Sequence, residues 1–179
     1  NTSCKVVLSL QDISVGCISH LSFDVYEGEC VVLQNMEQEV FHDFVSLLTQ
    51  TDVLEDGNII MDNKSVQILN NCNIAVIREY PVSSMIFQEL DYMNNLCMGL
   101  ARRIPDLWRK RHIRESIRKE YGSVLGEDVF YLSMEELSQR QKYRLVYTRI
   151  LLQHPKVVFC IQPFKRADLP HRMLIWQLM

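Results

Sequence analysis

Arg140 is the residue of this 179-residue chain that is least readily interpreted as neutral, because a cation near a helix start can bind an anion. It stands in the stretch Leu137-Ser138-Gln139-Arg140-Gln141, at the start of an amphipathic run. The spacing Ser138-x-x-Gln141 is that of a capping box, which satisfies free backbone N–H groups at the start of a helix. The pattern predicts a helix that continues to about Leu152. An anion at its start would interact with the Arg140 guanidinium and with exposed N–H groups.

Metal binding is not predicted, because the cysteines and histidines lack the close pairs that zinc sites use. The six cysteines are scattered and read as small buried hydrophobes in a reducing compartment. The five histidines are isolated as well. His42 beside Asp43 is interpreted as a solvated pair at the start of a helix, and a ligand role is the alternative.

The charge balance excludes a general cationic field. The chain has 19 Lys and Arg against 22 Asp and Glu, a net charge of −3, so no nucleic-acid partner is predicted. No apolar run reaches the ~18 residues of a membrane span, so direct membrane insertion is not expected. With the cysteine usage, this predicts a cytoplasmic protein. Only 6 glycines are present, which leaves few residues for backbone that approaches a phosphate closely.

The first third of the chain alternates strand and helix patterns. Strands are expected at Cys4–Leu10 and Leu21–Val25, joined by a polar stretch. Cys30–Leu33 is a short apolar run typical of a strand buried on both faces. A helix is expected next, because its apolar residues recur at helical spacing: Phe41, Phe44, Val45 and Leu48.

Further strands are expected at Gly57–Met61, Ile74–Ile77 and Val157–Ile161, and a last helix near Asp168. The sequence predicts one α/β domain over 1–179. Residues 1–28 and 57–77 give a β subdomain and core strands, about 87–137 a helical subdomain, and the remainder the core. Cys30–Leu33 and Val157–Ile161 are expected to be neighbouring central parallel strands. The apolar run Met173–Met179 has no cap, which predicts a C-terminally truncated piece of a larger polypeptide.

The ordered set of segments resembles an ATP-binding-cassette (ABC) transporter ATPase domain. The resemblance is carried by Glu27-Gly28-Glu29 before an apolar run, by Asn94-Asn95-Leu96-Cys97-Met98-Gly99, by Leu137-Ser138-Gln139-Arg140-Gln141, and by Pro155-Lys156 before the last apolar strand. It covers essentially the whole chain and implies a P-loop-NTPase (RecA-like) core with an antiparallel β subdomain and a helical subdomain. The likeness is greatest to the second half of bacterial carbohydrate-importer ATPases.

The resemblance implies a phosphate loop that this sequence does not carry. In the family this loop is G-x-x-G-x-G-K-S/T, whose backbone and lysine hold phosphates. Here Phe41 stands at the lysine position and His42 at the Ser/Thr position, while Glu37 and Glu39 bring like charge to a phosphate. The vestigial loop positions are Asn35, Gln38, Val40, Phe41 and His42.

The other family positions depart in the same way. Ile161 and Gln162 stand where the family has the Asp that holds the metal and the Glu that polarises water, so no catalytic residue remains. Arg78 stands at the Gln-loop position. The signature positions are Ser138, Gln139, Arg140 and Gln141. A simpler interpretation competes with the vestigial site, since Phe41, Phe44 and Ile161 satisfy packing in a core without any ligand.

Three functions follow from these residues. The first is a degenerate, non-hydrolytic half of a carbohydrate-importer ATPase that expects no bound ATP, magnesium or other cofactor. The second is a regulatory or sensing interaction domain within a larger protein. The third, an active ATPase with an unusual site, is the least favoured. The expected partner is a permease subunit or another cassette domain, contacted through the helical region around Trp108, whose arginines can also be read as a solvated helix face. The domain is then peripheral at the inner face of the cell membrane.

Overall fold

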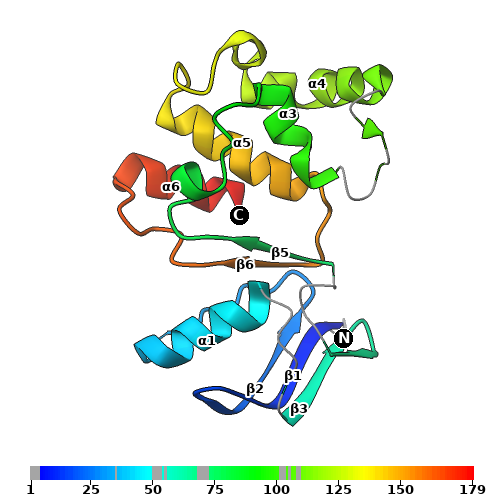
Figure 1. Ribbon diagram of the computed structural model, residues 1–179, viewed down its shortest axis with the longest axis vertical. Helices are drawn as coiled ribbons and strands as arrows, with labels where there is room; N and C mark the ends of the chain where they lie inside the picture. Colours follow the sequence, from blue (N-terminus) through cyan, green and yellow to red (C-terminus); the bar gives the residue numbers. More distant parts are fainter. Residues whose placement is uncertain are drawn as a thin grey trace. The chain divides into compact units, whose positions relative to one another are not determined.

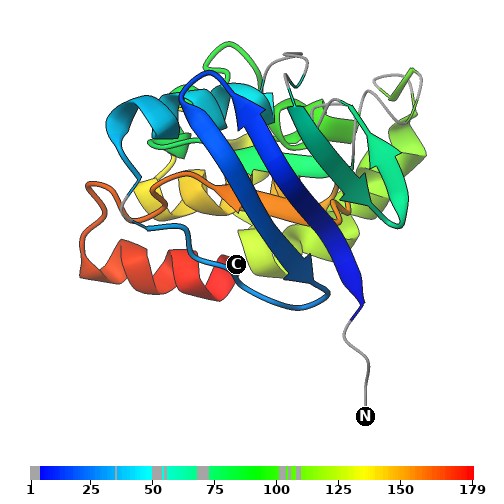
Figure 2. The ribbon, with the colours of Figure 1, turned by 90° about the horizontal axis from the view of Figure 1, so that it is seen from below.

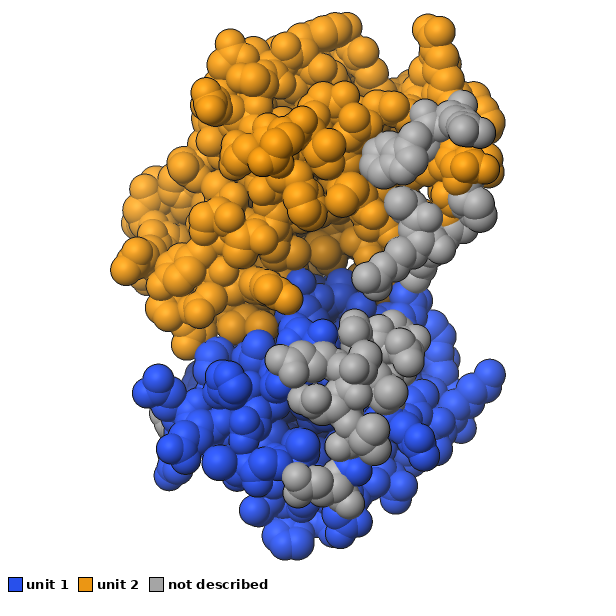
Figure 3. All heavy atoms as spheres, viewed as in Figure 1, with its two compact units in different colours: residues 1–76, 156–158 blue, residues 77–155, 159–179 orange. Residues whose placement is uncertain are grey.

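The computed structural model of the chain describes residues 5–34, 36–49, 54, 56–67, 73–100, 104, 106–107 and 110–179. The chain divides into two compact units, one of residues 1–76 and 156–158 and the other of residues 77–155 and 159–179 (Figure 3). Each unit is described by itself.

The first unit is built on a four-stranded antiparallel sheet in the order β2-β1-β3-β4. Figure 2 shows β1 (Val6–Val15) between β2 (Ile18–Tyr26) and β3 (Asp56–Met61), with β4 (Lys64–Val66) beyond β3. Alternate residues of β2 are exposed, as expected for an edge strand with one covered face. The predicted β subdomain is therefore present, and its first strand extends further than the sequence indicated.

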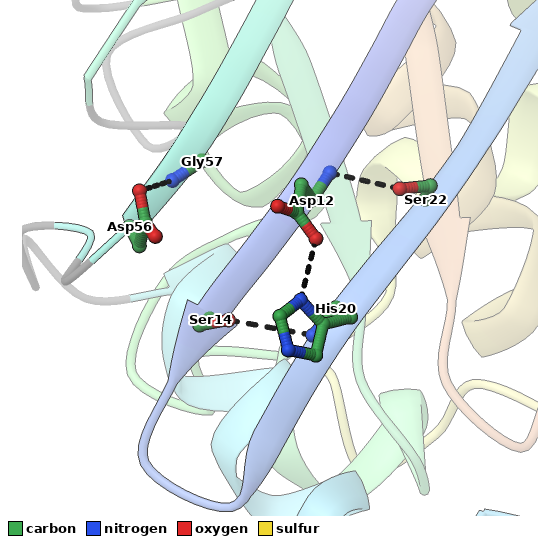
Figure 4. A network of polar contacts seen from close by, with 6 residues as sticks. All are labelled: Asp12, Ser14, His20, Ser22, Asp56 and Gly57. Atoms are coloured by element: carbon green, nitrogen blue, oxygen red, sulfur yellow. Dashed lines mark hydrogen bonds and ion pairs between the residues drawn. The ribbon is translucent and has the colours of Figure 1, made fainter.

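An irregularity in the β1–β2 hairpin explains why β1 continues through polar residues. Asp12 and His20 both have left-handed backbone, with φ of 53° and 54°, and their side chains meet at 2.7 Å between Oδ1 and Nδ1. The Asp12 N–H donates to Ser22 Oγ at 2.8 Å, and the His20 N–H donates to Ser14 Oγ (Figure 4). Side chains thus satisfy backbone groups where the strand register shifts.

Helix α1 (Gln38–Thr49) completes the first unit and confirms the helix predicted from apolar spacing. Phe44, Leu47 and Leu48 form its buried face. The helix is tied to the β1–β2 turn, because the Cys17 N–H donates to Asp43 Oδ2 at 2.7 Å.

The prediction for Cys30–Leu33 is wrong. The structure assigns no strand there, and Val31, Val32 and Leu33 are 39%, 66% and 39% exposed. A turn redirects the chain just before this run: the Glu29 N–H donates to Tyr26 O at 3.1 Å, and Glu29 Oε2 accepts from the Tyr26 N–H. An apolar run can be a buried strand only when a neighbouring strand pairs with it, and among the described residues none does.

β5 (Ile74–Ile77) and β6 (Val157–Cys160) form a separate two-stranded sheet. The Lys156 N–H donates to Asn73 O, and the Ile161 N–H donates to Ile77 O, both at 2.8 Å. Residue numbers rise together along both strands, so the pair is parallel. β6 therefore has a parallel partner, but this partner is β5 and not the predicted Cys30–Leu33.

Helices make up most of the second unit. They are α2 (Pro81–Ser84), α3 (Tyr92–Cys97), η2 (Met98–Leu100), α4 (Arg111–Leu125), η4 (Glu127–Tyr131), α5 (Gln139–Leu151) and α6 (Leu169–Leu178). Figure 1 shows α5 with α3 and α6 beside it. One apolar cluster joins the helices of residues 87–137 to α5 through Leu96, Ile117, Leu145 and Val146.

A buried arginine links α5 to the segment before α3. Arg149 is 5% exposed, and its guanidinium donates to Met85 O and, at 3.5 Å, to Asn95 O. It also lies 6.0 Å from the centre of the Phe87 ring. Asn95 is fully buried and bonds the Phe87 backbone on both sides, accepting from its N–H at 2.9 Å and donating to its carbonyl at 2.8 Å. This polar network holds the loop between α2 and α3 against the helices.

Candidate functional site

The predicted phosphate-loop positions lie at the start of α1. Gln38, Val40, Phe41 and His42 are helical rather than part of a loop, and Asn35 lies outside the described residues. The Phe41 N–H already donates to Glu37 O at 2.8 Å. Phe41, the predicted lysine position, is half-buried.

An open pocket beside these positions is lined mainly by acidic and polar residues: Cys17, Glu37, Gln38, Glu39, His42 and Asp43. Hydrogen bonding by the Cys17 N–H, and then by His42, lowers the pKa of Asp43. The His42 Nδ1 lies 3.3 Å from Asp43 Oδ1, and the imidazole is 81% exposed, which fits the interpretation as a solvated pair. Asp43 is thus occupied in joining α1 to the hairpin.

The signature positions form the N-terminus of α5 as the spacing predicted. Ser138 is the N-cap, and its Oγ accepts from the Gln141 N–H at 3.3 Å, while Gln141 Oε1 accepts from the Ser138 N–H at 2.8 Å. The capping box is confirmed. Gln139 and Arg140 are exposed. Ser138 and Gln141 use their polar atoms for capping, which leaves Gln139 and Arg140 as the signature side chains that are free of a capping role.

Two further predicted positions lie just after the carboxyl ends of β5 and β6. The Ile161 N–H donates to Ile77 O, so Arg78 and Gln162 follow directly at the same edge. Ile161 is 9% exposed and belongs to the core, as the simpler interpretation expected. Gln162 is exposed and has left-handed backbone, with φ of 45°. A buried isoleucine offers no oxygen to a metal, and a glutamine amide takes no proton.

Sequence reasoning missed the residues that occupy this edge. Glu79 and Tyr80 follow β5, and Lys165 and Arg166 follow β6. The Lys165 Nζ lies 2.6 Å from Glu79 Oε2, and this pairing, followed by the contact with Tyr80, raises the pKa of Lys165. Their position in the sequence could have indicated this cluster, because these polar residues follow directly after two apolar strands. Polar residues that follow parallel strands come together at the carboxyl edge of the sheet.

The described residues contain no group of three or more His, Cys, Asp or Glu side chains that could hold a metal ion. No described helix is both long and apolar enough to cross a bilayer. Trp108, the predicted centre of a partner surface, lies outside the described residues.

The fold is that of an ABC ATPase domain: an α/β chain with an antiparallel β subdomain and a helical part. The structure of CbiO1 from Clostridium perfringens, part of the ABC transporter complex CbiONQ, superposes with a TM-score of 0.76 at 14% sequence identity. The superposition covers 97% of this chain and 72% of CbiO1.

Proteins similar to the chain in sequence are ATP-binding proteins of ABC transporters as well. The methionine import ATP-binding protein MetN of Clostridium tetani is 28% identical over 154 residues, which are 84% of this chain and 48% of MetN. The phosphonates import ATP-binding protein PhnC of Lactobacillus acidophilus is 23% identical over 183 residues, 92% of this chain and 70% of PhnC. No family model matches the chain. The predicted resemblance to ABC ATP-binding domains is confirmed, and the chain spans about half the length of MetN.

Proposed function

We propose that this chain is a degenerate ABC ATP-binding domain that does not hydrolyse ATP and acts through protein contacts. The observation that carries the proposal is the set of residues at the family's chemical positions. Phe41, Ile161 and Gln162 have the place of the phosphate-binding lysine, the metal-holding aspartate and the water-polarising glutamate. Binding of phosphate, binding of metal and activation of water are thus lost together.

The electrostatics of the α1 N-terminus support the proposal. The free N–H groups of a helix start favour an anion. Glu37 and Glu39 are exposed there, and Asp43 has a lowered pKa, so it is charged at neutral pH. One unit charge 4 Å from a phosphate charge costs about 1 kcal/mol in water and about 4 kcal/mol at an effective dielectric constant of 20. Two carboxylates therefore offset what the helix terminus contributes.

We propose a partner and a location on the same basis. MetN and PhnC are named for the import of methionine and of phosphonates, and CbiO1 is part of a transporter complex. A chain with this fold and without catalytic residues would contribute a docking surface to such a complex, on the cytoplasmic side of a membrane. The helical region of about 87–137, around Trp108, is the proposed surface. The likeness to carbohydrate importers stays a prediction, since the named relatives import other compounds.

Steady-state ATP hydrolysis tests the proposal. The chain is assayed with magnesium and millimolar ATP beside Clostridium tetani MetN as the positive control. We expect phosphate release indistinguishable from the buffer blank for the chain and clear turnover for MetN. A matched variant, Gln162→Ala, separates intrinsic turnover from a contaminating ATPase, because the substitution does not change the rate of phosphate release by a contaminant. Turnover above the blank that Gln162→Ala abolishes would overturn the proposal.

A further inference from the structure

The carboxyl ends of β5 and β6 are joined by side chains as well as by the sheet. The last backbone bond of the pair runs from the Ile161 N–H to Ile77 O at 2.8 Å. Beyond this bond the two segments of the chain separate. One leads to α2 through Glu79 and Tyr80, and the other leads to α6 through Lys165 and Arg166. The Lys165–Glu79 ion pair then connects residues 86 positions apart in the sequence.

The contacts are centred on one aromatic ring. Lys165 Nζ lies 5.2 Å from the centre of the Tyr80 ring, and Arg166 Cζ lies 5.3 Å from it. Both distances are within the range of cation–π attraction. The side chains of Lys165 and Glu79 are 43% and 38% exposed. One acid, one ring and two cations therefore form a single half-exposed cluster.

The backbone around this cluster adopts an uncommon conformation. Tyr80, Gln162 and Arg166 have φ of 53°, 45° and 57°, in the left-handed region that residues other than glycine rarely occupy. Such conformations persist where surrounding contacts hold them. In the turn after β6 the Lys165 N–H donates to Gln162 O at 3.0 Å, but this local bond does not reach β5. The side-chain cluster supplies that link.

We propose that Glu79, Tyr80, Lys165 and Arg166 form a clasp that closes the carboxyl edge of β5 and β6 and couples the starts of α2 and α6. Glu79 and Tyr80 directly precede Pro81, the first residue of α2, and Arg166 lies two residues before Asp168, the N-cap of α6. Release of the clasp frees the turn 161–167 and the start of α2 together. The clasp is made only of this chain's own residues and requires no nucleotide.

Hydrogen–deuterium exchange on the whole chain tests the clasp, with peptides that cover 79–85 and 161–168. The variants are Glu79→Gln, Lys165→Met and their combination. We expect each single variant to speed exchange in both segments by about two- to fivefold, the range for a partly exposed ion pair. The double variant should exchange no faster than the single ones, because each removes the same interaction.

Glu115→Gln is the matched control, because it removes one negative charge just as Glu79→Gln does. It breaks the exposed ion pair of α4 between Arg111 Nε and Glu115 Oε1, which lie 2.8 Å apart. It should leave both segments unchanged. The charge swap Glu79→Lys with Lys165→Glu should restore slow exchange if the ion pair acts as a clasp. The proposal is overturned if the single variants leave both segments at the original rate, if only one segment responds, or if the swap exchanges as fast as Lys165→Met.

Discussion

Replacement of the buried Arg149 is the perturbation for which the structure gives the clearest magnitude. Its guanidinium serves the Met85 and Asn95 carbonyls from within the helical core, and no acidic side chain pairs with it among the described residues. Burial lowers its pKa to about 10. The charge is thus retained against a desolvation penalty because the guanidinium satisfies the Met85 carbonyl and adds a second donor to the Asn95 carbonyl, which also accepts from the Met98 N–H.

Arg149→Met keeps most of the side-chain stem and removes both donors. The Asn95 carbonyl keeps the Met98 N–H as a donor, so the loss falls on the Met85 carbonyl. A buried carbonyl left without a partner costs about 1–3 kcal/mol, and the removed desolvation penalty of the charge offsets part of that. We expect a net loss of about 1–2 kcal/mol for Arg149→Met. Arg149→Ala also loses the packing of the stem and should cost about 2–4 kcal/mol. The melting temperature should fall by roughly 2–4 °C per kcal/mol.

Urea denaturation and thermal melting measure these losses. Arg144→Met is the matched control on the same helix, because Arg144 is half-buried and donates to a single carbonyl, Val124 O, at 2.9 Å. It should cost less than about 1 kcal/mol. An Arg149→Met variant at least as stable as the original chain would refute the reasoning, because it would show that the Met85 carbonyl does not depend on the guanidinium.

Three further predictions concern single side chains. Gln162→Gly should raise the free energy of unfolding by up to about 1 kcal/mol, because glycine accepts the left-handed backbone at φ of 45°. Gln162→Val should lower the free energy of unfolding in the same urea titration, and the reverse order of stability would contradict the left-handed backbone at this residue. Burial raises the pKa of Tyr92 above its usual value of 10.0, so the protonated phenol contributes stability that is present below about pH 10 and is lost as pH rises further. Since its hydroxyl has no hydrogen-bond partner among the described residues, Tyr92→Phe should leave stability at pH 7 unchanged or raised by up to about 1 kcal/mol. It should also flatten the fall of stability between pH 10 and 12, and an equally steep fall would count against this origin. Ser138→Ala should cost about 1 kcal/mol by removing the N-cap of α5, whereas Ser123→Ala, at an exposed site within α4, should cost less in the same melts.

Local patterns predicted most elements correctly. Apolar spacing located α1, and the spacing Ser138-x-x-Gln141 located the start of α5 with its capping box. Asp168 is the N-cap of the last helix, as expected. These features depend on contacts within a few residues, which the sequence carries directly.

Pairing between distant segments was not predictable in the same way. The run Cys30–Leu33 has the composition of a buried strand, yet it is exposed, and β6 pairs with β5 instead. Composition indicates that a segment can be buried but not which segment will cover it. The clasp was missed for a related reason, since Lys165 and Glu79 meet only because two short strands run parallel.

Calorimetric titration of the chain with Mg·ATP tests the central claim most directly. We expect no saturable heat up to millimolar nucleotide, because the α1 N-terminus presents Glu37 and Glu39 with no lysine, and Ile161 offers no metal ligand. A dissociation constant of 1 mM corresponds to only about −4 kcal/mol, and loss of one charged phosphate contact removes most of that. Saturable binding tighter than ~0.1 mM, about −5.5 kcal/mol, would contradict the claim that this cassette domain has lost its nucleotide site.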